Sequence, residues 1–206
     1  MRVLDLFSGL GGWSKAFSER GHRVITVDIN PSFKPSIIGD VSKLTIGELR
    51  SHGPFDVILA SPPCECFSVA SIGKHWRGGN KAYIPNTKQA EKAINLVYKT
   101  LELIKQLSPP YWYMENPRGL LRKIIGIPVR TVWYCQYGDS RAKPTDIWGH
   151  HAPMEWRPEC HNGAKDHASA PRGHHTGTQG IKGVAMRSMI PYQLSLAVCL
   201  ACEKNE

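Results

Sequence analysis

A cysteine and a glutamate each follow an apolar run that is typical of a buried strand. Cys64 comes shortly after the run 55–60, in a turn stiffened by two prolines, and Glu115 follows the run 111–114. In open α/β sheets ligands bind at the carboxyl ends of the strands, so both side chains should reach the same edge. A thiol and a carboxylate that converge over a nucleotide-type site indicate covalent attack on a base.

A glycine-rich turn and two acids follow the first predicted strands. The turn follows the strand 2–7, and its glycines let the backbone approach a cofactor closely. Asp28 ends the strand 23–28, where nucleotide-binding sheets place a ribose-binding acid, and Asp40 follows a third strand and could bind an adenine amino group. Each acid alone would fit a solvated strand end. Together with the glycine turn they favour an adenosine-containing cofactor.

These residues require an α/β architecture to bring them together. Strand-like runs alternate with helical spacing, which argues for a doubly wound sheet. The remaining predicted elements are a helix over 87–107 capped by Thr87, strands at 111–114, 130–137 and 145–148, and a closing helix over 190–202. We therefore predict a mostly parallel, seven-stranded sheet.

Two segments show no clear period. Residues 69–85 are predicted to form a long, mobile loop, a lid carrying Lys74, His75, Trp76 and Arg77. Residues 150–183 are poor in aliphatic side chains and predict an irregular insert. We thus expect one domain, with a catalytic part over 1–149 and 184–206 interrupted by this insert.

Charge and composition narrow the class of partner. The 206 residues include 26 Lys and Arg against 17 Asp and Glu, a formal net charge of +9, which favours nucleic acid over a membrane. No apolar run approaches the ~20 residues of a membrane span. The six cysteines are dispersed, without a disulfide framework, and no signal peptide is recognisable. These features predict a cytoplasmic protein.

Four motifs in order make the chain resemble the cytosine-C5 DNA methyltransferases, most of all the compact enzymes of phages and prophages. The resemblance runs from Met1 to about Gly149 and rests on Asp5-Leu6-Phe7-Ser8-Gly9-Leu10-Gly11-Gly12, Pro63-Cys64-Glu65-Cys66-Phe67-Ser68, Glu115-Asn116, and Tyr137-Gly138 with Arg141 and Lys143. It implies a Rossmann-like methyltransferase fold, S-adenosylmethionine as cofactor, and double-stranded DNA as substrate. Methylation at C5 requires the cytosine to be flipped out of the duplex. Protection of phage DNA, as in restriction–modification, is the role that the resemblance suggests.

The resemblance also implies a role for each matched residue. Cys64 would add to cytosine C6, Glu115 would hold the N3 and N4 edge and donate a proton toward N3, and Arg141 would hold the base O2 and the flanking phosphate. The cofactor pocket would be lined by Phe7, Ser8, Gly9, Gly11, Gly12, Asp28, Ile29, Asp40 and Pro62. The substrate would be held by Pro63, Ser68, Asn116 and Lys143.

The chain departs from the family pattern in several places. Glu65 replaces a glutamine beside the thiol, the segment 137–139 lacks Val-Pro-Gln, and Ser195-Leu196 stand where Gly-Asn is usual. A large target-recognition domain is missing, and only the insert 150–183 is available to read bases. We therefore predict short or relaxed sequence specificity, or the help of a dimer or a specificity partner.

The insert allows two interpretations. Zinc could staple this segment through residues among Cys160, His161, Asp166 and His167, but it holds no CxxC pair and one cysteine. A basic loop that faces DNA is the preferred interpretation, and no metal is predicted. Its phosphate contacts would come from Arg172, His174, His175, Lys182 and Arg187.

Three other functions compete with DNA cytosine methylation. The turn Ser61-Pro62-Pro63 also resembles that of the amino-methyltransferases, but those enzymes need no thiol, and Cys64 argues against them. A tRNA cytosine-C5 methyltransferase is a closer alternative. A catalytically inactive, DNA-binding protein on a methyltransferase fold is an alternative of another class, against which the intact Cys64, Glu115 and Arg141 argue.

Overall fold

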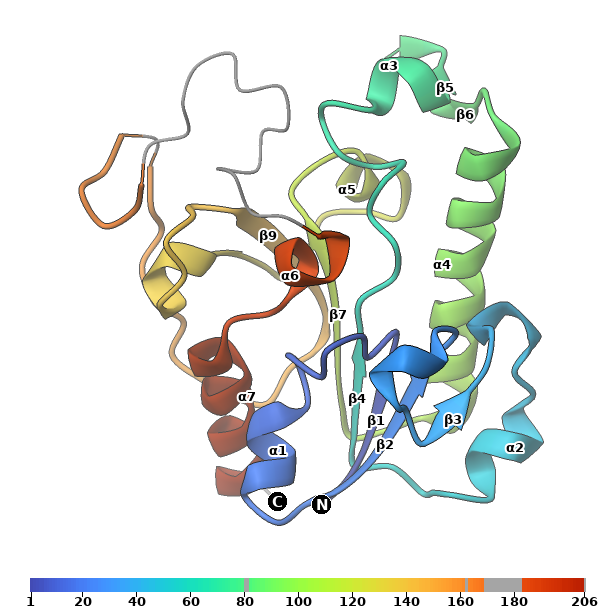
Figure 1. Ribbon diagram of the computed structural model, residues 1–206, viewed down its shortest axis with the longest axis vertical. Coiled ribbons are helices and arrows are strands. Elements are labelled where there is room, and N and C mark those ends of the chain that lie inside the picture. Colours follow the sequence, from blue (N-terminus) through green and yellow to red (C-terminus); the bar gives the residue numbers. More distant parts are fainter. Residues whose placement is uncertain (80–81, 162, 169–182, 206) are drawn as a thin grey trace.

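A seven-stranded sheet forms the centre of the molecule in the computed structural model, which describes residues 1–79, 82–161, 163–168 and 183–205 (Figure 1). The strand order is β3-β2-β1-β4-β7-β9-β8. The first five of these strands are parallel, whereas β9 runs antiparallel to both β7 and β8. The predicted mostly parallel, doubly wound sheet is confirmed. The strands are β1 (Arg2–Leu6), β2 (Arg23–Asp28), β3 (Ile37–Ile38), β4 (Val57–Ala60), β7 (Tyr111–Pro117), β8 (Arg130–Trp133) and β9 (Pro144–His150).

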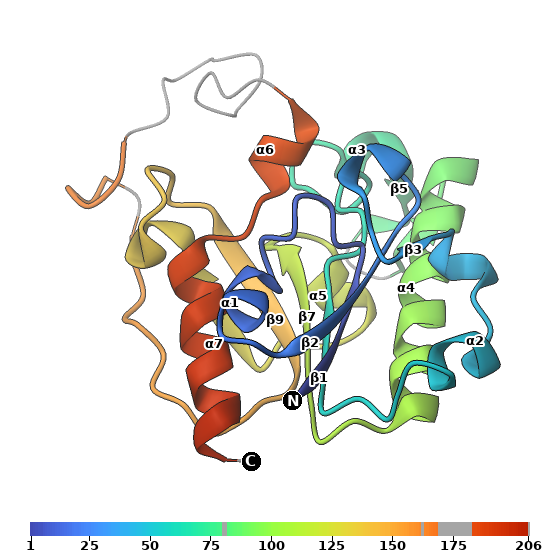
Figure 2. The same ribbon diagram turned by 60° about the horizontal axis from the view of Figure 1, so that its bottom comes forward.

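Helices cover both faces of the sheet, as Figures 1 and 2 show from two sides. One face packs against α4 and α2 through a core that includes Leu4, Ile58 and Met114. The other packs against α1 and α7 through Val3 and Tyr113 among others. The helices are α1 (Lys15–Glu19), α2 (Ile46–Arg50), α3 (Ile72–His75), α4 (Lys88–Leu107), α5 (Leu121–Ile124), α6 (Val184–Ser188) and α7 (Tyr192–Lys204).

The two longest helices begin and end close to where the sequence predicts. The Thr87 side chain accepts a hydrogen bond from the backbone N–H of Ala90 and caps α4, and Ser108 ends it in a left-handed conformation. Helix α7 lies beside α1, where the hydroxyl of Ser195 accepts a hydrogen bond from the Ala16 amide at 3.3 Å. Ser195, which stands where the resembled family has glycine, thus makes a buried contact between the last and first helices.

The segment 69–85 is the main correction to the predicted elements. It forms α3 and a small antiparallel pair, β5 (Trp76–Arg77) with β6 (Ile84–Pro85), where a lid without secondary structure is predicted. His75 and Trp76 are buried, because the Trp76 indole donates to the Cys66 carbonyl oxygen at 2.7 Å and the His75 ring bonds the Thr87 hydroxyl at 2.8 Å. Of the four side chains that the predicted lid carries, His75 and Trp76 therefore belong to the interior, whereas Lys74 and Arg77 are exposed.

Two strand boundaries also differ. The run predicted as a strand over 130–137 leaves the extended conformation after Trp133 and becomes a 3-10 turn, η4 (Tyr134–Tyr137). Strand β7 continues past Met114, so Glu115 and Asn116 lie within a strand that pairs with β9. Both differences bring side chains to the carboxyl edge of the sheet, where the site is built.

The insert is irregular over 151–161 and 163–168, where the structure has no helix or strand. It still contributes to the core, since Ala152 and Cys160 are buried. The proposed phosphate-binding residues Arg172, His174, His175 and Lys182 lie outside the described residues. Within the described part of the chain, no helix is long and apolar enough to cross a membrane.

Candidate active site

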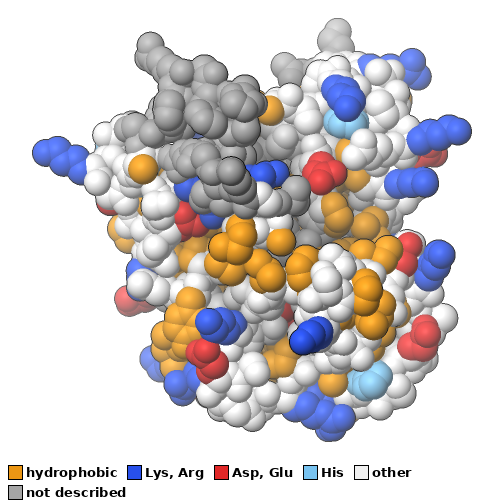
Figure 3. Space-filling view, in the orientation of Figure 1, with side chains coloured by type: hydrophobic (Ala, Val, Ile, Leu, Met, Phe, Trp, Pro, Cys, Tyr) orange, Lys and Arg blue, Asp and Glu red, His pale blue; other side chains and the backbone are white. Residues whose placement is uncertain are grey.

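A cavity of about 730 Å³ opens at the carboxyl ends of β1, β2, β4 and β7. Helix α6 lies over one side of it (Figure 1), and Figure 3 shows this face of the molecule hollowed beside a group of hydrophobic side chains. Of the residues predicted to form the site, the cavity is lined by Phe7, Ser8, Gly9, Gly12, Asp28, Ile29, Asp40, Pro62, Pro63, Cys64, Glu115 and Lys143.

The Asp28 carboxylate shapes the glycine turn after β1. One of its oxygens accepts a hydrogen bond from the Gly9 amide at 2.9 Å, and the other accepts one from the Asn30 amide at 2.8 Å. Gly9 has a φ of 50°, in the left-handed region that favours glycine. Ile29, which also lines the cavity, is 67% exposed. The turn therefore presents backbone groups, an acid and an uncovered apolar side chain to one ligand.

Asp5 is a buried acid of this cavity that the sequence reasoning did not single out. One carboxylate oxygen accepts a hydrogen bond from the Ser14 hydroxyl at 2.5 Å, while the other has no hydrogen-bond partner among the described residues. Burial raises the pKa of Asp5 to about 7, and the Ser14 hydrogen bond opposes this rise. An unmet buried acceptor that faces a cavity suits a ligand with a donor group.

The raised pKa of Asp5 should make the free energy of unfolding depend on pH. An unfolded aspartate has a pKa near ~3.9, so the contribution of Asp5 to stability is present below about pH 4 and is lost as the pH rises to about 7. Urea unfolding of the wild type and Asp5→Asn at pH 5 and pH 8 should show this loss, on the order of 2 kcal/mol, only in the wild type. Equal pH dependence in both proteins would contradict the assignment.

Cys64 is held at the mouth of the cavity by its turn. The Asn116 side chain donates to the Pro62 carbonyl oxygen at 2.9 Å, and the Phe67 amide donates to the Cys64 carbonyl oxygen at 2.9 Å. Burial, with a further contribution from Glu115, raises the pKa of the partly buried Cys64 to about 11, and Lys143 opposes this rise. Cys66 does not share this position and is 2% exposed within the core.

Glu115, Tyr134 and Lys143 form a group beside the thiol, in which Glu115 and Tyr134 are buried and Lys143 is half-buried. The Tyr134 hydroxyl donates to a Glu115 carboxylate oxygen at 3.0 Å, and the Lys143 ammonium lies 4.3 Å from the centre of the Tyr134 ring. Burial raises the pKa of Glu115, against the opposing effects of Lys143 and Tyr134. Burial also lowers the pKa of Lys143. Perturbed pKa values of this kind are typical of groups that give or take protons at a functional site.

Four residues predicted for the site do not line the cavity. Arg141 pairs with both carboxylate oxygens of Asp139 and donates to the Arg187 carbonyl oxygen at 3.0 Å. Asn116 is fully buried under the Cys64 turn, and the Ser68 hydroxyl bonds that of Ser71 at 2.9 Å. Gly11 shapes the turn with a φ of 75°. Lys143 is therefore the predicted cation that the structure places at the cavity.

Tyr134 was missed because the segment 130–137 reads as one strand, in which alternate side chains should reach opposite faces. Its place in η4 turns the ring toward Glu115 instead. The sequence offered one signal, which is that Tyr134 lies shortly before the matched residues Arg141 and Lys143.

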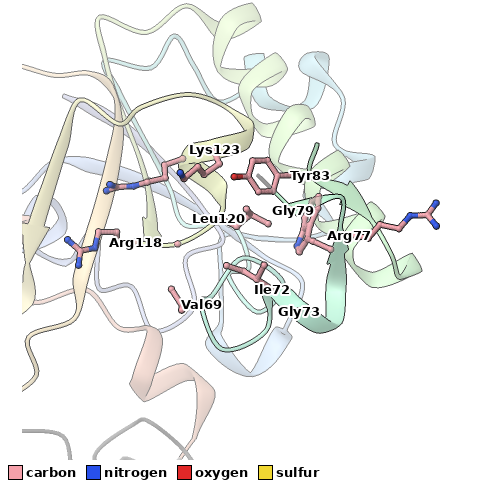
Figure 4. A pocket seen from close by; sticks show the side chains of 12 residues that line it. Val69, Ile72, Gly73, Arg77, Gly79, Tyr83, Arg118, Leu120 and Lys123 are labelled. Atoms are coloured by element: carbon pink, nitrogen blue, oxygen red, sulfur yellow. The ribbon is translucent and has the colours of Figure 1, made fainter. Parts of the chain in front are cut away.

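A second cavity, of about 530 Å³, lies between α3 and the segment that leads into α5 (Figure 4). Val69, Ile72 and Leu120 supply apolar walls, and Arg118 and Lys123 add positive charge. Neither Cys64 nor Glu115 lines it. The two cavities share no lining residue among those that the structure describes, so the second cavity is not part of the candidate active site.

A comparison with protein families matches residues 1–127 to the C-5 cytosine-specific DNA methylases. The chain belongs to this family. The matched region contains Asp5, Cys64 and Glu115, and Tyr134 and Lys143 lie beyond it. The predicted resemblance and the predicted class of enzyme are thus confirmed.

Two relatives illustrate the similarity. A frog virus 3 (isolate Goorha) protein named "Probable DNA (cytosine-5)-methyltransferase" is 34% identical over 152 residues, 72% of this chain and 70% of that protein. The type II methyltransferase M.DdeI of Desulfomicrobium norvegicum is 28% identical over 133 residues, 59% of this chain and 29% of the relative. The chain therefore spans less than a third of the length of that bacterial methylase.

Solved structures confirm the fold. The Entamoeba histolytica methyltransferase EhMeth superposes with a TM-score of 0.52 at 19% identity, over 78% of this chain and 56% of that one. An E. coli protein described as a "putative DNA modification methyltransferase encoded within prophage" gives a TM-score of 0.50 at 21% identity, over 72% of this chain and 46% of that one.

Proposed function

We propose that this methylase transfers a methyl group from S-adenosylmethionine to C5 of a flipped-out cytosine in duplex DNA, through a covalent bond between Cys64 and C6. The observation that carries the proposal is the meeting of Cys64, Glu115 and Lys143 in one cavity with the glycine turn. Family membership supports DNA cytosine as the target, and the net charge of +9 suits a polyanion.

The residues of the cavity fit S-adenosylmethionine. Asp28 and Asp40 offer carboxylates for ribose and adenine donors, Ile29 offers an apolar surface, and the unmet oxygen of Asp5 suits an ammonium group. When bound, this cofactor supplies an electrophilic methyl group. Gly12 brings the backbone of the turn close to the start of α7, since a Cβ there would lie 2.8 Å from the Ile190 nitrogen.

The chain's own groups would act on the base as follows. The Cys64 thiolate forms a bond to C6, and this attack pushes negative charge onto N3. The buried Glu115 carboxyl donates a proton toward N3 and so neutralises that charge. After C5 has gained the methyl group, it loses its proton to a base, the bond to Cys64 breaks, and N3 returns its proton to Glu115. Lys143 stabilises the thiolate, and Tyr134 holds Glu115 in place.

The direct test is transfer of labelled methyl from S-adenosylmethionine to duplex DNA, with nucleoside analysis of the product. We expect labelled 5-methylcytosine in DNA. Label in tRNA but not in DNA would redirect the proposal to RNA. Cofactor binding without transfer to either nucleic acid would support the inactive, DNA-binding alternative. Bisulfite sequencing of the product would then measure the predicted short or relaxed target sequence.

Removing the acid at the end of β2 should weaken cofactor binding. Asp28→Ala loses both hydrogen bonds to the backbone of the turn and the carboxylate itself, so we expect the Kd for S-adenosylmethionine to rise by about 10- to 100-fold. Asp56→Ala is the matched control and should leave the Kd nearly unchanged, because that carboxylate accepts a hydrogen bond from the Arg2 amide and does not line the cavity. Calorimetric titration measures both, and equal effects would contradict the assignment.

The cation beside the thiol should matter through its charge. Lys143→Met keeps a chain of similar length but removes the charge that lowers the pKa of Cys64, so the rate should fall by about 10- to 100-fold and the rising limb of its pH profile should move to higher pH. Lys143→Arg should retain much of the rate. A pH–rate profile of the three proteins checks this, and an unshifted limb in Lys143→Met would contradict it.

We also propose that residues 1–149 and 184–206 form the catalytic part and that the insert 150–183 has a separate role. We propose that residues 150–183, together with a dimer or partner surface, supply the contacts that select the sequence around the cytosine.

A further inference from the structure

Two thiols and an imidazole converge away from the active-site cavity. The sulfur atoms of Cys135 and Cys160 and a ring nitrogen of His167 all lie within 4.8 Å of one another. Cys135 belongs to η4, whereas Cys160 and His167 come from the insert. Cys160 and His167 approach most closely, with Sγ and Nδ1 3.4 Å apart. The cluster thus joins two segments that are distant in the sequence.

The three side chains are withdrawn from solvent. Cys135 and Cys160 are 9% and 7% exposed, and the His167 side chain is 3% exposed although its backbone is not buried. The Asp166 carboxylate lies next to them, with one oxygen 3.6 Å from the Cys160 sulfur and 3.7 Å from the His167 ring nitrogen. Among the described residues, the apolar packing of the cluster consists of Trp133 and the small side chains Ala142 and Ala164.

Another group of three potential ligands has a different explanation. His22, Cys199 and Glu203 also lie together, but both carboxylate oxygens of Glu203 are bonded by the Arg20 guanidinium at 2.8 and 2.7 Å, and His22 adds a further bond at 2.8 Å. That group is a satisfied ion pair. The cluster of Cys135, Cys160 and His167 has no neighbouring cation of this kind among the contacts of its described residues.

We propose that Cys135, Cys160 and His167 bind a structural zinc ion, with Asp166 or a water molecule in the fourth position. A set of two thiolates and one imidazole binds zinc in preference to magnesium or calcium. A fourth ligand would complete the tetrahedral geometry of a structural zinc site. Binding would release the two thiol protons to solvent. Sequence reasoning considered Cys160 and His167 but lacked a second thiol, because Cys135 lies 25 positions earlier, in a predicted strand.

The position of the cluster suggests what the metal would do. Ala142, the residue between Arg141 and Lys143, packs against Trp133, Cys135 and Cys160. The Tyr134 amide donates to the Ala142 carbonyl oxygen at 2.9 Å, and the Ala168 amide donates to the Ser140 carbonyl oxygen at 2.8 Å. Zinc would therefore anchor the insert to the segment that carries Lys143 to the active site, where a core of few apolar side chains supplies little stability.

The test is the zinc content of the full chain, expressed with added zinc and purified without chelators or metal-affinity columns. We expect about one zinc ion per chain by mass spectrometry of the metal. Cys160→Ala and His167→Ala should lose most of it. His161→Ala, which removes the exposed neighbouring histidine, and Cys202→Ala, which removes a buried thiol elsewhere, should keep it.

A thiol titration of the folded wild type keeps the test independent of how the variants fold. Adding a strong chelator should make two further thiols reactive, and added zinc should protect them again. The proposal is overturned if the wild type holds no zinc, if Cys160→Ala holds as much as the wild type, or if the two thiols return only with a reductant, which would show a disulfide between Cys135 and Cys160. None of these readouts depends on methyl transfer.

Discussion

Cys64→Ala is expected to lower kcat/KM for methyl transfer by at least about 10³-fold while leaving S-adenosylmethionine binding nearly unchanged. The reason is that no other thiol can replace it in the cavity. Cys66, the neighbouring thiol, is buried in the core, and its carbonyl oxygen is held by the Trp76 indole. The measurement is labelled methyl transfer to duplex DNA beside calorimetric binding of the cofactor.

Cys66→Ala is the matched control, because it removes a thiol two residues away without touching the cavity. It should retain most of the activity. A duplex with 5-fluorocytosine should stay covalently attached to the wild type and to Cys66→Ala but not to Cys64→Ala, since fluorine cannot leave as the C5 proton does. Trapping that persists in Cys64→Ala would refute the proposed nucleophile.

Glu115→Gln is expected to produce two opposite effects at the same site. Methyl transfer should fall by about 10²- to 10⁴-fold, because glutamine cannot donate and recover the proton at N3. Cys64, in contrast, should react faster with iodoacetamide, since the Glu115 carboxylate contributes to the raised pKa of the thiol and the variant removes that charge. Because unfolding would also expose Cys64 and speed its alkylation, Glu115→Gln must show both effects while it still binds S-adenosylmethionine with nearly the wild-type Kd.

The pH dependence follows from the directions of the two shifts. Burial raises the pKa of Glu115, so its proton-donating form persists to higher pH than that of an ordinary glutamate and is lost as the pH rises through that raised value. Thiolate formation at Cys64 has the opposite sign and grows with pH. The wild-type rate should therefore pass through a maximum, and Glu115→Gln should lack the falling limb that belongs to Glu115. An identical falling limb in both proteins would contradict this role.

The sequence alone could predict those site residues that lie at the ends of strands. Cys64, Glu115 and Asp28 each follow or end an apolar run, and parallel strands deliver their carboxyl ends to one edge, so local pattern determines where these side chains meet. Helix α4 could be predicted equally well, because a capping threonine marks its start and apolar residues recur along it at helical spacing. Spacing alone was enough in these cases.

Side chains brought together by irregular segments could not be predicted in this way. Tyr134 and Cys135 gain their positions from a 3-10 turn that interrupts a strand-like run, and Trp76 is buried in a segment with no period. The ion pair of Arg141 with Asp139 depends on a local turn as well. In such segments tertiary contacts decide the conformation, and no repeating pattern records them.

Met1 and the end of α7 lie near each other, at the edge of the sheet opposite the active site (Figure 1). The Met1 ammonium bonds the His22 ring at 3.2 Å, and the same ring bonds Glu203 at 2.8 Å, so a single imidazole links the first strand to the last helix. A short linker between the ends should therefore yield circular permutants that keep the fold. A targeting module fused at either end would leave the catalytic face open, which makes this methylase a compact candidate for directing cytosine methylation to chosen sites.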